Sequence, residues 1–465
     1  MFSKKTKLYG WSEYKKYDCE VFFPQNKYEI CDFIKNNKNI KIIPRGHGCS
    51  FGDQAICSSD LGAVIDISKM NKIISYDEEL NILSVDAGIQ LKDILKFSIP
   101  KNLILASIPG GLEITVGGAI ANNVHGKDCF KKGYFENNVI SMEVINSEGN
   151  LIKLSESENP EIFKNIFYSM GLLCIIVNVQ IKLIKIPSQI LNVETKIINN
   201  LNEMKNSFDS LTPENADYCV AWLDCFAKDE NLLRGLFQTA KFEKYHKKQI
   251  KINNSYFESP DKKKIFGLIP IGFIWFIAKI FFKTSIFKYL NSIIFNLSKT
   301  LPKKKFIPFV EFMMLETKYL PSYKSWFKPH GFLTIHPFFY GSDAFEKIKQ
   351  AIKLCQKYGV IPFWCPIKKY KKNNSHPLAF GGEGYSIVID FFPKEYSEEK
   401  LRNFFNDFEA LILKQGGNYY LSKDQIMSKE FFKKTYPKLD EFKKIKSSID
   451  KNNIFISNQF ARLFK

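Results

Sequence analysis

Short apolar runs separated by polar turns occupy the chain up to residue 187 and predict alternating strands and helices. Runs that are almost wholly apolar, or that alternate apolar and polar positions, predict strands at residues 40–43, 63–67, 82–85, 139–144, 151–154 and 174–183. Apolar residues at helical spacing predict helices at 29–35 and 91–97. The polar turn Ser147-Glu148-Gly149-Asn150 predicts a hairpin between two of the strands. This region is therefore expected to be an α+β domain with its glycine-rich loops at one edge.

The pattern changes after residue 187 and predicts a second domain. Strands are expected at 218–223, near Phe332, near Ile361 and at 385–392, and amphipathic helices are expected at 342–358 and 396–413. A chain of 465 residues is long enough to form two substantial cores.

One segment of the second region is unusually apolar. Residues 266–282 consist mostly of Phe, Ile, Leu and Trp, but they fall short of the roughly 20 residues that a membrane-spanning helix needs. Residues 286–297 are also largely apolar, and lysine triplets stand at 262–264 and 303–305. Apolar surface flanked by lysines is typical of peripheral membrane contact. We expect such a contact at about 266–305, with packing into the second domain's core as the alternative.

The charge and cysteine content narrow the class of protein further. Lysine and arginine number 67 against 48 acidic residues, a formal net charge of +19, which indicates a solvated lysine-rich surface or an anionic partner such as lipid. No nucleic-acid-binding motif accompanies this charge, so no nucleic-acid partner is expected. The 10 cysteines have no paired short spacing, so no metal site is expected. Residues 1–20 lack the apolar core of a signal peptide, which favours a cytoplasmic location.

Two glycine-rich segments, 44–53 and 108–126, each follow a predicted strand. Glycine adopts positive φ without strain and lets the backbone approach a ligand closely, so such loops can present peptide N–H groups to a diphosphate. Neither segment has the spacing of the Gly-x-Gly-x-x-Gly fingerprint or of the phosphate-binding loop of nucleotide hydrolases. The sequence therefore indicates a flavoenzyme rather than a protein with a Rossmann NAD site.

The two glycine segments together resemble the FAD-binding domain of the PCMH-type flavoproteins, the vanillyl-alcohol-oxidase-like family. Further matching pieces follow in the family's order, and they include Gly10-Trp11, Gly133-Tyr134-Phe135-Glu136, Ala221-Trp222-Leu223-Asp224, Gly331-Phe332-Leu333, Pro377-Leu378-Ala379-Phe380, Tyr420-Leu421-Ser422-Lys423-Asp424 and Phe455-Ile456-Ser457. Within this family the chain resembles the branch that contains the decaprenylphosphoryl-β-D-ribose 2′-oxidases.

The resemblance implies a two-domain α+β fold. Residues 1–187 and a C-terminal return at 416–465 would form the FAD domain, and 188–415 would form a substrate domain built on a mixed sheet. It also implies oxidation of a sugar hydroxyl, the 2′-OH of a polyprenyl-phosphate-linked pentose, with hydride transfer to flavin N5. A quinone or other acceptor would reoxidise the flavin. A short-chain NAD(P)H-dependent reductase would complete an epimerisation, and the enzyme would be peripheral on the inner face of the cytoplasmic membrane.

Two alternatives stay open. The first is a soluble aldonolactone or alditol oxidase, similar to D-arabinono-1,4-lactone oxidase, but such enzymes commonly attach FAD through a histidine at the position of Cys49. Non-covalent FAD is therefore expected, with a link through the Cys49 sulfur as the other possibility. The second alternative is a non-catalytic scaffold, which the segment 168–174 favours, because relatives tend to have Gly-Gly-Asn-Gly-Leu-Thr-Gly there.

The expected cofactor-binding residues lie in the glycine segments and at the start of one strand. They are Arg45, Gly46, His47, Gly48, Cys49, Ser50, Phe51, Gly52, Asp53, Pro109, Gly110, Thr115, Val116, Gly117, Gly118, Ala121, Asn122, His125, Gly126 and Ile175. Arg45 could neutralise the cofactor's diphosphate. The family usually has Tyr at the position of Phe51.

Oxidation of a secondary alcohol needs a hydride acceptor, a base and positive charge near the reduced flavin. The resemblance assigns the positive charge to Lys423, which could also hold the reacting hydroxyl. His125 could move a proton near neutral pH, or it could simply hydrogen-bond a loop carbonyl. The expected substrate-contacting residues are Trp222, His336, Lys368, Val388 and Lys423. His336 replaces a family Gln and Val388 replaces a Cys of some relatives, which leaves the sugar open.

Overall fold

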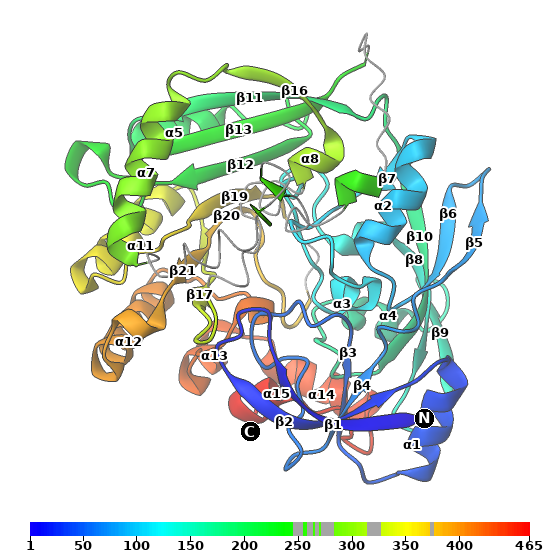
Figure 1. The fold of residues 1–465 in the computed structure, drawn as a ribbon. Coiled ribbons are helices and arrows are strands. Elements are labelled where there is room, and N and C mark those ends of the chain that lie inside the picture. Colours follow the sequence, from blue (N-terminus) through cyan, green and yellow to red (C-terminus); the bar gives the residue numbers. More distant parts are fainter. Residues whose placement is uncertain (245–253, 258–263, 266–268, 271–282, 314–326, 373–375) are drawn as a thin grey trace.

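A computed structural model describes residues 1–244, 254–257, 264–265, 269–270, 283–313, 327–372 and 376–465 (Figure 1). The first sheet contains the N-terminus and has the spatial order β1-β2-β4-β3. Its strands are β1 (Phe2–Tyr9), β2 (Lys16–Phe23), β4 (Ala63–Asp66) and β3 (Ile42–Arg45). β1 and β2 are antiparallel, whereas β4 runs parallel to both β2 and β3. The Asn26 side chain caps α1 (Lys27–Asn36) by accepting a hydrogen bond from Glu29 N (3.1 Å).

The second sheet is antiparallel and has the order β5-β6-β10-β8-β9, with β7 also pairing with β10. Its strands are β5 (Ile73–Asp77), β6 (Ile82–Asp86), β7 (Leu103–Leu105), β8 (Val139–Ile145), β9 (Leu151–Ser155) and β10 (Ile175–Lys185). The predicted hairpin turn joins β8 to β9, with Gly149 at φ +77°. The helices of this region are α2 (Leu91–Ser98), α3 (Val116–Ala121) and α4 (Pro160–Ile166).

The third sheet is antiparallel and has the order β16-β11-β13-β12-β19-β20-β18. Its strands are β11 (Ile190–Ile198), β12 (Tyr218–Leu223), β13 (Gly235–Phe242), β16 (Lys304–Pro308), β18 (Phe338–Tyr340), β19 (Pro366–Tyr370) and β20 (Gly384–Ile387). Helices α5 (Leu201–Asp209) and α11 (Ala344–Tyr358) pack on one face, where the Phe208 and Phe237 rings are 4.9 Å apart and the Phe345 and Tyr385 rings 4.8 Å apart. The opposite face of the sheet turns toward the second glycine segment, where the Tyr370 and His125 rings are 4.9 Å apart.

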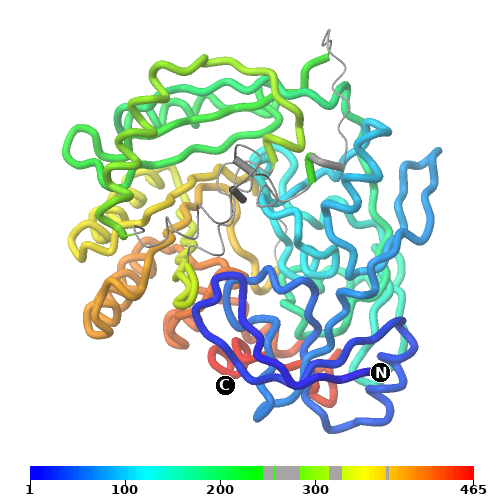
Figure 2. The backbone as a smooth tube through the Cα atoms, in the orientation of Figure 1, coloured from blue at the N-terminus to red at the C-terminus, as the bar shows by residue number. Residues whose placement is uncertain are grey.

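The remaining elements connect these sheets. They are β14 (Lys264–Ile265), β15 (Ile269–Pro270), α7 (Thr284–Ser298), α8 (Phe309–Met313), β17 (Leu333–Ile335), β21 (Ile389–Phe391), α12 (Glu398–Lys414), α13 (Lys429–Thr435), α14 (Leu439–Ile449) and α15 (Asn458–Leu463). The C-terminal helices, red in Figures 1 and 2, lie beside the blue first sheet. Ile42 N donates a hydrogen bond to Ile454 O (2.7 Å), and Ile456 N donates one to Ile42 O (2.9 Å). The last residues of the chain are thus hydrogen-bonded to a strand near its start.

The α+β fold predicted from the sequence is confirmed, and two predicted strands differ in detail. The run 385–392 is divided at Val388 between β20 and β21, and β21 pairs with β17 outside the third sheet. The strand expected near Ile361 begins instead at Pro366. The domain boundaries at 187 and 415 stay a prediction.

Part of the apolar segment expected to face a membrane, residues 266–268 and 271–282, lies outside the described residues. The described continuation is α7, whose buried residues Phe287, Asn291 and Phe295 recur at helical spacing. Among the residues that the structure describes, no helix combines the length and apolarity needed to cross a bilayer.

Candidate active site

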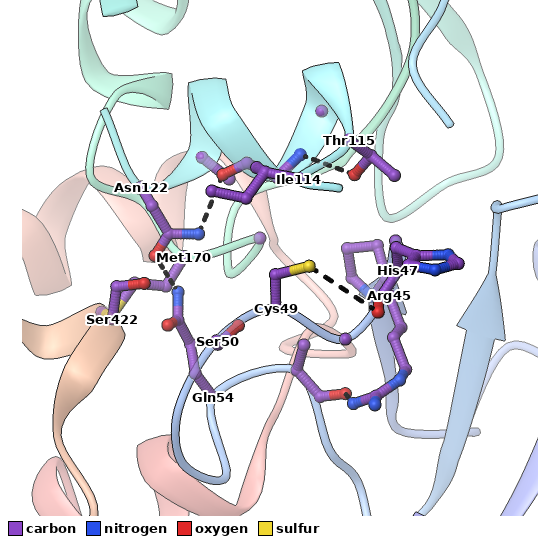
Figure 3. Close-up of a pocket in the computed structure, with 18 of the residues that line it drawn as sticks. Arg45, His47, Cys49, Ser50, Gln54, Ile114, Thr115, Asn122, Met170 and Ser422 are labelled. Atoms are coloured by element: carbon purple, nitrogen blue, oxygen red, sulfur yellow. Dashed lines mark hydrogen bonds between the residues drawn. The ribbon is translucent and has the colours of Figure 1, made fainter. Parts of the chain in front are cut away.

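An open cavity lies between the loop that follows β3 and helix α3 (Figure 3). Its wall comes from both glycine segments, from residues near 170 and from one residue near the C-terminus. The lining residues are Pro44, Arg45, Gly46, His47, Gly48, Cys49, Ser50, Gln54, Ala55, Ile67, Ile114, Thr115, Gly117, Gly118, Ala121, Asn122, Val124, Met170, Gly171, Cys174, Ile176 and Ser422. Because much of this wall is backbone and small side chains, a ligand can approach the main chain closely.

The first loop packs tightly against the start of α3. A Cβ atom at Gly46 would lie 2.1 Å from Thr115 Oγ1, so a side chain there would force the two segments apart. Gly48 has φ +68°, in the left-handed region that favours glycine. Thr115 Oγ1 in turn accepts a hydrogen bond from Gly118 N (3.3 Å) and caps the helix. The spacing of these residues therefore determines the shape of the cavity.

Asn122 links helix α3 to the first glycine loop and to the C-terminal segment around Tyr420. Its Nδ2 donates to Gly118 O (2.9 Å), and Gln54 Nε2 donates to its Oδ1, as Figure 3 shows. Tyr420 Oη donates to Asn122 O (3.0 Å) and brings in the C-terminal segment. Gln54 and Asn122 thus hold the glycine loop and helix α3 at a set separation.

Arg45 lines the cavity and also braces the loop that contains it. Its Nη1 donates to Ala55 O (3.2 Å) and its Nη2 donates to Tyr9 O (2.9 Å). A Cβ at Gly48 would lie 2.2 Å from Arg45 Nη2, so the guanidinium lies directly beneath the loop. Its suggested part in neutralising a diphosphate stays a prediction.

The structure brings many of the predicted cofactor-binding residues together around the cavity. Those that line it are Arg45, Gly46, His47, Gly48, Cys49, Ser50, Thr115, Gly117, Gly118, Ala121 and Asn122. The predicted residues that are not part of the lining are Phe51, Gly52, Asp53, Pro109, Gly110, Val116, His125, Gly126 and Ile175.

Several residues outside the lining have structural contacts instead. Asp53 Oδ1 lies 3.1 Å from Arg462 Nη2, in an ion pair that also includes Asp424. A Cβ at Gly126 would lie 1.7 Å from Ile108 O, so that glycine permits close packing of two backbone segments. Ile175 is fully buried at the start of β10, and its neighbour Ile176 lines the cavity, because adjacent strand residues point to opposite faces.

The segment 168–174, where relatives tend to have glycines, keeps a backbone suited to glycine. Tyr168 has φ +62° and Met170 has φ +57°, which is strained for residues with a Cβ. Tyr168 Oη donates to Phe380 O (3.1 Å), and Met170 N donates to Ala121 O (2.8 Å). Met170 and Cys174 of this segment line the cavity, whereas Tyr168 is not part of the lining.

Sequence reasoning missed several lining residues. They are Pro44, Gln54, Ala55, Ile67, Ile114, Val124, Met170, Gly171, Cys174, Ile176 and Ser422. Met170, Gly171 and Cys174 belong to the segment that already departed from the family pattern, which was the signal that could have identified them. Ser422 had a weaker signal, its position beside Lys423.

Outside the cavity lining, two buried histidines lie near two lysines. The His125 and His336 ring centroids are 5.8 Å apart, and the Phe380 ring lies 5.6 Å from His125 and 4.9 Å from His336. Lys368 and Lys423 are close enough to both imidazoles to affect their titration. The structure therefore gathers four of the residues predicted for catalysis or substrate contact.

The face of the third sheet that lies away from α5 and α11 contributes to this cluster. Lys368 lies opposite Ser386, and Trp222 lies opposite Pro366, next but one to Lys368 along β19. Because opposite residues and alternate residues share a face, Trp222, Lys368 and Ser386 all point to the same side. The Trp222 ring stacks with that of Trp364 at 6.4 Å, and its Nε1 has no hydrogen-bond partner among the described residues. Val388 is buried at the break between β20 and β21.

Burial determines the charge state of this cluster. It lowers the pKa of His125 well below its ordinary value, and the positive charges of Lys368 and Lys423 lower it further. Burial likewise lowers the pKa of His336, with Lys423, His125 and Lys368 adding to the effect. Both imidazoles are therefore neutral at pH 7, so each can accept or donate a hydrogen bond without carrying charge.

The cavity and its surroundings fit FAD. The glycine-lined wall allows backbone approach to a diphosphate. His125 Nδ1 and His336 Nδ1 are buried, and neither has a partner among the described residues. Unpaired buried polar atoms of this kind are costly unless a ligand or water pairs with them.

Comparisons with known proteins agree with this geometry. A family model described as an FAD binding domain matches residues 20–155, and one described as D-arabinono-1,4-lactone oxidase matches residues 335–463. The chain is 27% identical to the decaprenylphosphoryl-beta-D-ribose oxidase of Mycolicibacterium smegmatis, over 91% of this chain and 89% of that protein.

Other relatives are named for the oxidation of lactones. The L-gulonolactone oxidase of Mus musculus is 21% identical over 99% of each chain. The D-arabinono-1,4-lactone oxidase of Candida glabrata is 26% identical over 37% of this chain and 34% of that protein. With the glycine loops lining one cavity, these matches identify the chain as a member of the PCMH-type FAD-binding flavoproteins, an FAD-linked oxidoreductase that acts on CH–OH groups.

Proposed function

We propose that this protein oxidises a secondary hydroxyl of a sugar joined to a lipid phosphate, most specifically the 2′-OH of a polyprenyl-phosphate-linked pentose. The observation that carries the proposal is the meeting of Lys423, Lys368 and two neutral histidines beside the glycine-lined cavity. A quinone or similar acceptor would take up the electrons, and a short-chain NAD(P)H-dependent reductase would use the keto product.

FAD held by the glycine loops would supply a hydride acceptor. The chain's own residues would bind the substrate and accept the hydroxyl proton. Lys423, half-buried beside the cavity residue Ser422, would hold the reacting hydroxyl and stabilise negative charge that develops during oxidation. His125, neutral because burial lowers its pKa, would be available over the neutral pH range to accept the hydroxyl proton. Lys368, on the face of the third sheet that lies away from α5 and α11, would attract the substrate's phosphate.

A lipid carrier is supported by the outer face of α7. Tyr289, Ile293 and Leu297 are 68%, 52% and 58% exposed, a large apolar surface for a helix in contact with water. Residues 283–305 contain six lysines, at 283, 288, 299, 303, 304 and 305, and no acidic residue. Apolar surface and positive charge act together at an anionic bilayer. We therefore propose peripheral binding of α7 at the inner face of the cytoplasmic membrane.

The experiment that tests the reaction is anaerobic reduction of the FAD-loaded protein. A short-chain polyprenylphosphoryl ribose should bleach the flavin absorbance, and the keto product should be recovered in equal amount. Lys423→Met, compared with the exposed control Lys429→Met, should slow bleaching by about 10²-fold or more. A flavin that no lipid-linked pentose reduces would refute the proposed substrate.

An aldonolactone or alditol oxidase is the second candidate. The match of residues 335–463 to the model described as D-arabinono-1,4-lactone oxidase favours it. In the same experiment, free lactones or alditols would then bleach the flavin, and the lipid-linked sugar would not. If FAD binds but none of these compounds reduces it, a non-catalytic role becomes the better account.

A further inference from the structure

Three buried side chains form a hydrogen-bonded chain that ends on His336. Tyr370 Oη lies 2.8 Å from Ser386 Oγ, and Ser386 Oγ lies 2.9 Å from His336 Nε2. Tyr370 and Ser386 are each 1% exposed and His336 is 2% exposed, so water does not compete for these groups. Tyr370 and Ser386 come from neighbouring strands of the third sheet, and His336 follows β17.

The direction of the hydrogen bonds follows from the protons that need partners. If Tyr370 Oη donates to Ser386, the Ser386 hydroxyl is free to donate its own proton to His336 Nε2. In the reverse direction, the Tyr370 proton would have no acceptor among the described residues and the bare His336 Nδ1 would have no donor, so two buried groups would be unpaired instead of one. A buried phenol proton without a partner costs about 1–3 kcal/mol. The chain therefore runs from Tyr370 through Ser386 to His336.

This direction selects one tautomer of His336. Because Nε2 accepts a hydrogen bond and the ring is neutral, the ring proton must be on Nδ1. Nδ1 has no hydrogen-bond partner among the described residues, although it is buried. The Nδ1–H group is thus a buried donor that is held in one orientation and can bind an acceptor on a ligand.

We propose that His336 is a specificity-determining residue whose Nδ1–H donates a hydrogen bond to an oxygen of the sugar substrate. Tyr370 and Ser386 are positioning residues that hold His336 in the tautomer needed for this bond. The choice of sugar as the ligand rests on the proposed function, whereas the tautomer rests on the hydrogen-bonded chain and on the neutral charge of the buried ring. A buried donor of this kind selects strongly, since a ligand without a matching acceptor leaves it unpaired.

The tautomer can be read directly by NMR of the FAD-loaded protein with ¹⁵N-labelled histidine. The chain has 6 histidines, and signals absent from His336→Gln belong to His336. Protonated and bare ring nitrogens have well separated ¹⁵N shifts, so the two tautomers are easily told apart. We expect a protonated Nδ1 and a bare Nε2. A protonated Nε2 in the unaltered protein would overturn the proposal.

Two substitutions test the positioning residues. Ser386→Ala and Tyr370→Phe should each move His336 toward a mixture of tautomers, because Nε2 loses its fixed donor. Ser141→Ala removes a buried strand hydroxyl that bonds Gln180, and Tyr340→Phe removes a phenol that bonds Gly381 O, so neither should alter the His336 signals. If His336 has the same tautomer in Ser386→Ala as in the unaltered protein, the hydrogen-bonded chain does not select the tautomer.

The sugar contact is tested by kinetics with polyprenylphosphoryl ribose and its deoxy analogues. His336→Leu should lower kcat/KM about ten-fold or more for the full sugar, and His336→Gln, which keeps an N–H donor, should recover part of the loss. One deoxy analogue should lose this discrimination between the unaltered enzyme and His336→Leu. Equal losses for every analogue would overturn the contact. Failure of all sugars as substrates would overturn the proposed function and the contact together, while the NMR result decides the tautomer separately.

Discussion

The ammonium group of Lys423 lies 4.7 Å from the centroid of the Phe51 ring. Phe51 N also donates a hydrogen bond to Ser422 O (3.0 Å), so the first glycine loop and the C-terminal segment are joined side by side. A cation held over an aromatic face has a limited range of positions. The contact therefore places the positive charge of Lys423 beside Ser422, at the edge of the glycine-lined cavity.

Lys423→Met should lower kcat by about 10²–10³-fold, the effect of removing one charge-stabilising group from an active site. FAD should stay bound, because the residues that line the cavity are unchanged. The measurement is steady-state turnover together with the flavin-to-protein ratio. Lys429→Met, on the exposed start of α13, is the control. A variant that loses FAD as well as activity would assign Lys423 to cofactor retention instead.

Arg462→Met should destabilise the protein by about 3 kcal/mol, because it leaves two carboxylates buried without a counter-charge. Arg462 Nη2 lies 2.7 Å from Asp424 Oδ2 and 3.1 Å from Asp53 Oδ1. Thermal unfolding measures the loss. The surface pair Lys434–Glu430, at 2.7 Å, is the control, since Lys434→Met removes only a solvent-exposed contact and should leave the unfolding temperature nearly unchanged.

Asp128 should make stability depend on pH. Burial raises the pKa of this carboxyl to about 7, although Ile108 N donates to its Oδ2 (2.9 Å). The folded protein therefore holds a proton that the unfolded chain has already lost, and stability falls as pH rises from about 4 through about 7.

Asp128→Asn should flatten this dependence, so that its Tm relative to the unaltered protein is higher at pH 8 than at pH 5. The upper limit of the effect is on the order of 4 kcal/mol. Asp32→Asn, at an exposed position of α1, should leave the pH dependence unchanged. Parallel pH profiles for Asp128→Asn and the unaltered protein would contradict a raised pKa.

The double substitution Ile293→Asp with Leu297→Asp should weaken binding to anionic phosphatidylglycerol vesicles at least about ten-fold, since each apolar side chain contributes roughly 1–3 kcal/mol when buried. Co-sedimentation measures the binding. Ile74→Asp with Leu80→Asp is the matched control, because these residues are 54% and 53% exposed on the β5–β6 hairpin. Equal binding of both variants would mean that α7 is not the membrane-facing surface.

FAD should leave the protein on acid precipitation. The Cys49 thiol lines the cavity and donates to His47 O at 3.9 Å, in the position where a covalent link would otherwise form. The flavin content of supernatant and pellet measures the outcome. Flavin that stays in the pellet for the unaltered protein, but not for Cys49→Ala, would establish a cysteinyl link.

Elements with a local signal could be predicted from the sequence. The run 218–223 matches β12, and 63–67 matches β4 to within one residue, because apolar runs between turns are a property of the segment itself. The run 385–392 could not be resolved into β20 and β21, because both strands are buried on both sides and show no alternation at the break.

The same limit applies to the site. Gly46 and Thr115 could be identified because the glycine spacing of each loop is visible along the chain. Asp53 lies in the same motif, yet it pairs with Arg462, which the chain places some four hundred residues later. No local pattern predicts such a partner.

The sequence by itself determined the family, the cofactor and the glycine-rich loops that line the cavity, because close approach to a ligand requires glycine at particular positions and glycine is visible in a sequence. Only the tertiary structure decided which buried side chains surround His336. His336, Ser386 and Tyr370 come together through strand pairing and burial, and those same contacts select the His336 tautomer. Charge state and proton position depend on neighbours in space, which a linear pattern does not contain.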